Sequence, residues 1–98
     1  MQALIVTIVT DLIDGEAREY DVATDNRDLI RWDLRRGKEG WPKQTDAPTL
    51  FAVFMAWSAL TRTGRLTTDF EAFAQAVPYA TARLDDVDPT RAATAADS

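Results

Sequence analysis

The feature that most constrains the fold is the stretch 49–60, TLFAVFMAWSAL, in which all but two residues are apolar. At about 100° per residue it resolves into a bulky stripe that includes Trp57, a strip of alanines, and a third sector that holds Phe51 and Met55. A helix that is apolar nearly all round is normally buried, and this one is shorter than the roughly 20 residues that a membrane span requires. We therefore expect a central core helix over about 48–63, with a partner-binding or self-association helix as the alternative.

The composition excludes several kinds of function. With 98 residues, 46% of them hydrophobic, the chain has the size and composition of one soluble globular domain. It contains neither cysteine nor histidine, so disulfides, thiolate ligands and the usual general base are excluded. Its net charge of −5 argues against a global attraction to nucleic acid or anionic membranes. Because no phosphate-binding glycine loop and no signal peptide is recognisable either, we expect a cytosolic, non-enzymatic binding protein without metal or cofactor.

Residues 3–23 have the composition and turn signal of a β-hairpin. Leu, Ile, Val and Thr dominate the first half, and Asp14-Gly15 is a favoured two-residue hairpin turn because both positions tolerate positive φ. Such a turn would place Val9 opposite Tyr20.

The register of this hairpin decides the position of three apolar side chains. With a two-residue turn, Leu4, Val6 and Ile8 point away from the helices and form an exposed outer face, which suggests pairing with another copy or another chain. A slip of one residue would turn the same side chains inward. The sequence leaves both alternatives open.

Asp25 and Asp28 resemble a capping box at the start of a helix over about 26–36 that stops at Gly37. Asp33 lies within the expected inward arc, where a carboxylate needs a partner such as Arg36 or Arg62 or else a position at the rim. That inward arc comprises Leu29, Ile30 and Leu34.

Two tryptophans fall outside this arc. Trp32 lies among charged residues, where it could stack on an arginine, anchor an interface, or pack against the following loop. Trp41 precedes Pro42, which holds it extended, so its indole can cover the core as a plug or remain exposed for recognition. We expect Asp33, Trp41 and Trp57 to be structural residues.

The remaining elements complete the expected fold. Asp46 or Thr45 should cap the central helix, and Thr68 with Glu71 should cap a third helix over about 69–77. Residues 79–84 are expected to add a turn, and the acidic, small-residue segment 85–98 to be disordered. The prediction is one α+β domain over 1–84, with the hairpin packed on a three-helix bundle.

Three short motifs together carry a resemblance. DNRDLIRWD (25–33) is followed by GWP (40–42) and then by AWSALTRTG (56–64), with Phe70 downstream. From the hairpin to about Val77, this arrangement resembles the tail assembly chaperones of long-tailed actinobacterial phages and prophages. The resemblance implies a non-enzymatic protein of the infected cell that keeps the helical tape-measure protein soluble during virion assembly. In such families a translational frameshift often produces a longer form.

The grouping of apolar residues on the helix and strand faces suggests which residues contact such a client. Met and aromatic side chains adapt to varied helical partners, and self-association would multiply the contacts. The candidate protein-binding residues are Trp32, Phe51, Met55, Leu4, Val6 and Ile8.

Three alternatives to a chaperone remain. One is a small virion component such as a head-tail connector or tail terminator. Another is a nucleic-acid-binding accessory protein, which would use Trp32 and a basic cluster, and a third is an inhibitor of a host defence protein. The basic cluster comprises Arg31, Arg35, Arg36 and Lys38.

Overall fold

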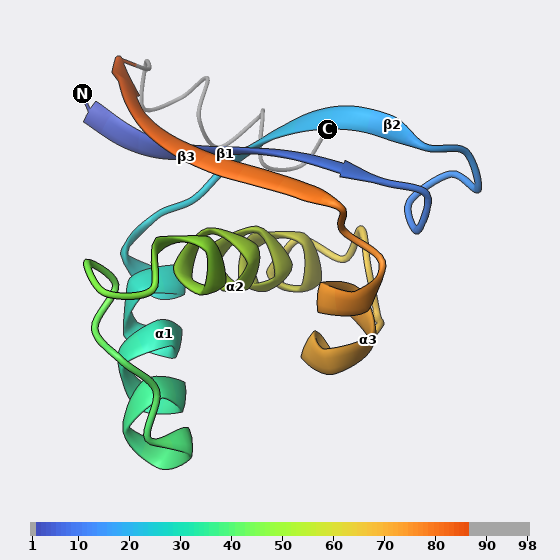
Figure 1. The fold of residues 1–98 in the computed structure, drawn as a ribbon. Helices are drawn as coiled ribbons and strands as arrows, with labels where there is room; N and C mark the ends of the chain where they lie inside the picture. Colours follow the sequence, from blue (N-terminus) through green and yellow to red (C-terminus); the bar gives the residue numbers. More distant parts are fainter. Residues whose placement is uncertain (1, 87–98) are drawn as a thin grey trace.

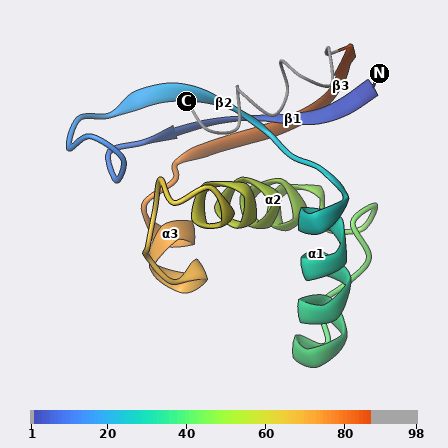
Figure 2. The same ribbon diagram turned by 180° about the vertical axis from the view of Figure 1, so that it is seen from behind.

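The structure, a computed structural model, describes residues 2–86 and has an α+β fold in which the helices lie on one side of an antiparallel sheet (Figures 1 and 2). Its elements, in chain order, are β1 (Gln2–Thr10), β2 (Arg18–Ala23), α1 (Asn26–Glu39), α2 (Pro48–Arg62), α3 (Phe70–Gln75) and β3 (Tyr79–Asp86). The strands are arranged in the order β2-β1-β3, so β1 is central. Most of the tail expected to be disordered, 87–98, lies outside the described residues.

The register of β1 and β2 differs by one residue from the two-residue-turn prediction. Ile8 lies opposite Tyr20 and Val6 opposite Val22, because the connection spans residues 11–17 instead of Asp14-Gly15 alone. The slip turns Val6 and Ile8 toward α2, where both are completely buried. The alternative register of the sequence analysis is therefore the correct one.

The third strand was not expected from the sequence. Residues 79–84, predicted to form a turn, belong to β3 together with the first two residues of the predicted tail. β3 pairs with β1 so that Leu84 lies opposite Leu4 and Ala80 lies opposite Ile8. A two-stranded ribbon is marginal by itself, whereas a third strand makes the sheet stable against a helical layer.

Helix α1 runs longer than predicted. Its capping box is confirmed, since the Asp25 side chain accepts from the Arg27 backbone N–H and the Asp28 side chain accepts from that of Asp25. The helix passes through Gly37 and ends at Gly40, whose φ of 71° is the left-handed conformation that favours glycine at a helix end.

The predicted caps of the other two helices are wrong. α2 begins at Pro48, whose preset φ suits the first turn, and neither Thr45 nor Asp46 caps it; the N-cap position is Ala47. At α3, Asp69 takes the cap position and accepts from the Ala72 backbone N–H at 2.8 Å.

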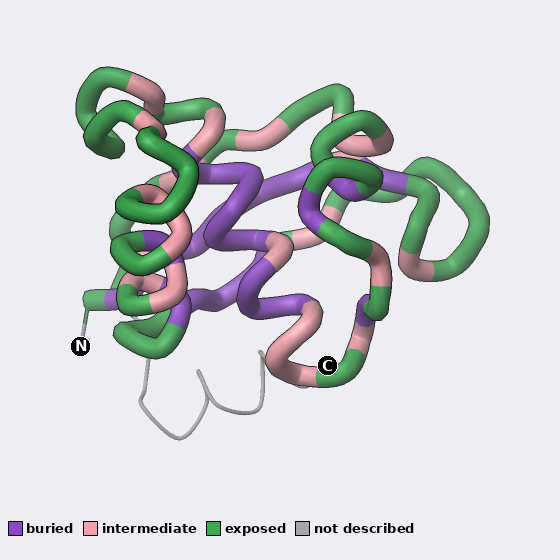
Figure 3. Tube along the Cα trace, turned by 90° about the horizontal axis from the view of Figure 1, so that it is seen from below, coloured by how far each residue is buried: buried purple, intermediate pink, exposed green. Residues whose placement is uncertain are grey.

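Helix α2 is the centre of the core, as its sequence predicts. It packs against the sheet on one side and against α1 and α3 on others, and the buried positions gather along it (Figure 3). α1, by contrast, is buried along one side only.

Candidate functional site

Helix α1 is attached to α2 by a buried carboxylate, and that carboxylate is Asp28. Arg62 donates from Nε to Oδ1 at 3.2 Å and from Nη2 to Oδ2 at 2.9 Å, and Ser58 Oγ donates to Oδ1 at 2.6 Å. Asp33, the acid expected in the inward arc, is exposed instead. The expected pairing of Asp33 with Arg36 or Arg62 is therefore wrong, because the buried acid that Arg62 binds is Asp28.

Trp32 lies in the core and not at an interface. Only 2% of its surface is exposed, and its ring centroid lies 5.2 Å from that of Phe51 and 5.6 Å from that of Phe54. Trp41 covers it at 5.8 Å. A partner protein cannot reach Trp32 in this structure, so the prediction of an exposed contact is wrong.

The same correction applies to Phe51 and Met55. Met55 is 0% exposed and Phe51 is buried, because α2 packs against the sheet and against both other helices. Val6 and Ile8 are lost as surface candidates through the register of the hairpin, and Leu4 is half-buried at the end of the sheet.

The two tryptophans expected to be structural, Trp41 and Trp57, lie in one aromatic cluster. Trp57 packs 5.4 Å from Phe54, and its Nε1 donates to the Thr68 carbonyl at 2.8 Å. Trp41 packs 5.4 Å from Phe70, so its indole covers the core.

Part of the basic cluster is engaged with these aromatic rings. The Arg31 guanidinium lies 5.1 Å from the Trp57 ring centroid. Arg35 lies 5.4 Å from that of Trp41 and pairs with Glu71 at 2.8 Å. With Trp32 buried behind them, these arginines do not present the aromatic and basic surface on which the nucleic-acid alternative depends.

Exposed apolar side chains occur where the sequence predicted core. On α1, Ile30 is 58% and Leu34 is 71% exposed, and at a separation of four residues they are neighbours on one helix face. By the helical rotation, three basic side chains lie beside this pair, and Asp33 borders it on the other flank. We call Ile30 and Leu34, together with the flanking Arg27, Arg31 and Lys38, the α1 outer face.

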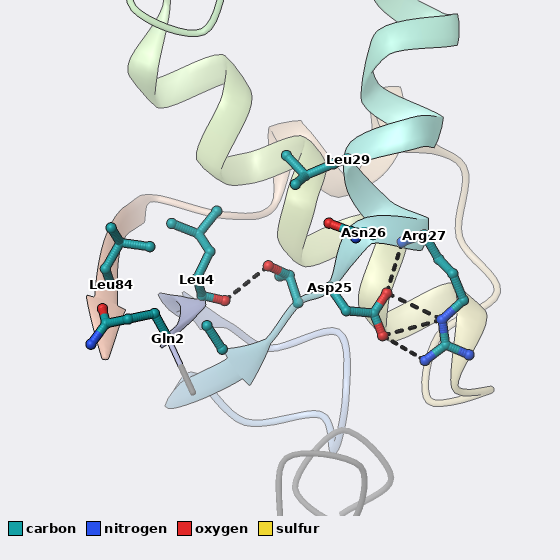
Figure 4. Close-up of a pocket in the computed structure, with 9 residues that line it drawn as sticks. Gln2, Leu4, Asp25, Asn26, Arg27, Leu29 and Leu84 are labelled. Atoms are coloured by element: carbon teal, nitrogen blue, oxygen red, sulfur yellow. Dashed lines mark hydrogen bonds and ion pairs between the residues drawn. The ribbon is translucent and has the colours of Figure 1, made fainter. Parts of the chain in front are cut away.

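A groove lies at the junction of the sheet with the start of α1. Figure 4 shows Leu4 from β1, Leu29 from α1 and Leu84 from β3 around it. Its volume is about 470 Å³, and its polar rim includes Asp25 and Arg27, which hydrogen-bond to each other. Leu84 is 69% exposed at its mouth.

The face of the sheet turned away from the helices carries a charged network. Thr7 donates to Asp21 at 2.5 Å, and Arg83 donates to the Thr7 hydroxyl at 2.7 Å and to Asp21 at 3.4 Å. The Thr7 hydrogen bond, with a further contribution from Arg83, holds the pKa of Asp21 below its ordinary value. The pKa of Asp25 is likewise lowered, chiefly by the hydrogen bond from Arg27.

Comparison with known proteins yields no match: no family model, no curated protein and no solved structure is significantly similar to this chain. None of the helices between residues 2 and 86 combines the length and the apolar character that crossing a bilayer requires. Within the same residues, no acidic side chains group in a way that could hold a metal ion.

Sequence reasoning missed the α1 outer face because it assigned the wrong side of α1 to the core. A signal was present, since Asp28 and Trp32 lie four residues apart and thus share a face. A large aromatic one turn from a capping acid competes with the aliphatic arc for the core, and here it occupies the core.

Proposed function

We propose that this protein is a non-catalytic tail assembly chaperone that binds the tape-measure protein in the cytoplasm of a phage-infected bacterium and keeps it soluble. The motifs at 25–33, 40–42 and 56–64 suggest the family. The surface that we assign to the client is the α1 outer face, in place of the buried residues that the sequence analysis favoured.

The observation that carries this proposal is the exposure of Ile30 and Leu34. Isolated exposed aliphatics are ordinary on protein surfaces, but these two are adjacent on a helix whose opposite side is anchored by Asp28 and Trp32. The anchoring fixes the orientation of the pair toward solvent. A rigid, preorganised apolar pair binds with a smaller loss of conformational entropy than a mobile one.

The geometry suits a helical client. Two aliphatic residues one turn apart form the same short seam that helices offer one another in a coiled coil. The exposed Lys38 beside the seam would pair with acidic side chains flanking an apolar stripe on the client. Several copies acting along one long client would add avidity to a contact of this size.

The test is co-expression with the tape-measure protein encoded in the same genome. We expect the client to be found in the soluble fraction with the wild-type chain and in the pellet without it. Ile30→Asp combined with Leu34→Asp should abolish the effect, because both changes place a charge in the apolar seam without touching the core.

The matched control is Leu12→Asp, which introduces the same charge at an exposed leucine in the connection between β1 and β2. It should leave client solubility unchanged. A client that is equally soluble without this chain, or equally protected by the Ile30 and Leu34 variant, would refute the proposal.

A further inference from the structure

The pairing of β1 with its two neighbours determines which backbone N–H and C=O groups of β3 face the outer edge of the sheet. In the part of the chain that the structure describes, β3 pairs only with β1. The Leu4 carbonyl accepts from the Thr24 backbone N–H at 3.0 Å, so at Leu4 the β1 peptide groups face β2. Peptide groups alternate in direction along an antiparallel strand, and those at Ala3 and Ile5 therefore face β3.

The register carries this pattern across to β3. Ala3 lies opposite Asp85 and Ile5 opposite Arg83, so these two β3 residues direct their N–H and C=O groups to β1. The intervening residues, Ala82, Leu84 and Asp86, direct theirs to the outer edge. An edge of this kind is a template for a further strand.

The charged side chains on this edge match those on the same edge of a second copy. In the sequence around Leu84, a basic residue precedes the leucine and an acidic residue follows it. If two β3 strands pair antiparallel about a two-fold axis at Leu84, Arg83 of each copy lies directly opposite Asp85 of the other. We infer that β3 is the interface with a second copy of this chain, joined in this register into a continuous six-stranded sheet.

Both charged side chains are partly exposed, and Arg83 also contacts Thr7 and Asp21 within the chain. Arg83 is 45% exposed and Asp85 is 54% exposed, and the two lie 3.7 Å apart within one chain. In the paired strands they occupy a position without main-chain hydrogen bonds, where side chains approach most closely and opposite charges are most favourable. The arrangement occurs twice by symmetry.

The helix side of the sheet offers an apolar contact in the same register. Leu84 points to that side with Leu4, at the mouth of the groove shown in Figure 4. The two-fold axis brings the Leu84 side chains of both copies together and removes this exposed surface from water.

Neighbouring registers lack this match. The peptide alternation permits only shifts by two residues, and the next such pairing places Arg83 opposite Arg83, where like charges repel. Shifting by two more places Thr81 opposite Arg83 and Tyr79 opposite Asp85, which leaves the charges without opposite partners. Charge complementarity thus selects the axis at Leu84.

The experiment is sedimentation equilibrium of the full chain and two charge-reversal variants. Asp85→Arg leaves only positive charges at the paired positions 83 and 85, and Arg83→Asp leaves only negative charges there. We expect each variant alone to dimerise at least about tenfold more weakly than wild type. An equimolar mixture should form a heterodimer of near wild-type affinity, because each positive position then faces a negative one.

Asp11→Arg is the matched control, since it makes the same charge change at an exposed loop residue. It should dimerise as wild type does. Circular dichroism establishes that each variant is folded, because Arg83 also contacts Thr7 and Asp21 within the chain.

Amide hydrogen exchange of the wild-type chain supplies a second readout that needs no variant. The amides of Arg83 and Asp85 should be protected at all concentrations, whereas those of Ala82 and Leu84 should become protected as the concentration rises. A wild-type chain that stays monomeric, variants that dimerise normally, or a mixture that fails to associate would each overturn the inference. None of these outcomes bears on client binding by the α1 outer face.

Discussion

Arg62, in the last turn of α2, donates hydrogen bonds to both carboxylate oxygens of Asp28, in the first turn of α1, at 3.2 and 2.9 Å. The carboxylate is fully buried, and the Ser58 hydroxyl donates a third hydrogen bond. A buried charge that lost its partner would be very costly. This pair therefore determines how α1 docks and which of its faces remains exposed.

Removing the acid should destabilise the protein strongly. Asp28→Ala removes the buried partner of the mostly buried Arg62 guanidinium, which keeps only Asp25 at 3.7 Å. It also removes the half of the capping box that accepts from the Asp25 backbone N–H. We expect the free energy of unfolding in urea to fall by about 3 kcal/mol. Asp33→Ala is the control, with an expected change within about 0.5 kcal/mol because that side chain is exposed. Equal effects of the two substitutions would contradict the assignment of Asp28 as the buried acid.

Met55, predicted to contact a partner, is buried, and Leu34, predicted to be in the core, is exposed. Truncating each side chain tests these positions. Met55→Ala should lower the free energy of unfolding by about 3 kcal/mol, since it leaves a cavity in the core. Leu34→Ala should change it by no more than about 0.5 kcal/mol, because Leu34 is largely in water. Chemical denaturation of both variants measures the difference. A large loss for Leu34→Ala would mean that α1 docks by its other face.

Two glycines of one helix should respond with opposite signs to the same substitution. Gly40→Ala should destabilise the protein by about 1 kcal/mol, because φ of 71° is strained for any residue with a Cβ. Gly37→Ala should stabilise it by about 0.5–1 kcal/mol, because this position is inside the helix and a Cβ there meets nothing within 4 Å. Thermal unfolding followed by circular dichroism distinguishes the two. The same sign for both would contradict a helix that ends at Gly40.

Stability should decline in acid. The folded-state pKa values of Asp21 and Asp25 lie below the ordinary value of 3.8, so the unfolded chain binds protons first as the pH falls. Their contribution is complete above about pH 5, and it is lost as the pH falls through 3.8 toward the folded-state values. Urea denaturation between pH 2 and 6 measures this slope.

The control for this pH dependence is Thr7→Val, which removes the hydrogen bond that does most to lower the pKa of Asp21. It should flatten the decline in acid while leaving the core side of the sheet intact. An unchanged slope would show that Thr7 does not hold this carboxylate.

The elements whose signals are local were predictable. The capping box at Asp25 and Asp28 appears where the sequence places it, and the apolar stretch 49–60 forms the central helix. The third strand was missed because residues 79–86 are half small or acidic. The alternation of Ala80, Ala82 and Leu84 with polar residues was its only local sign.

The candidate binding surface was the least predictable part. The sequence determined by itself that α1 and α2 are helices, that α2 is buried, and which residues share each helix face. Tertiary structure alone decided which face of α1 is covered and which register the hairpin adopts. Periodicity groups residues on a face, but the choice between faces depends on a partner distant in the sequence. For α1 that partner is Arg62, 34 residues from Asp28. For β1 that partner is α2, which covers Val6 and Ile8.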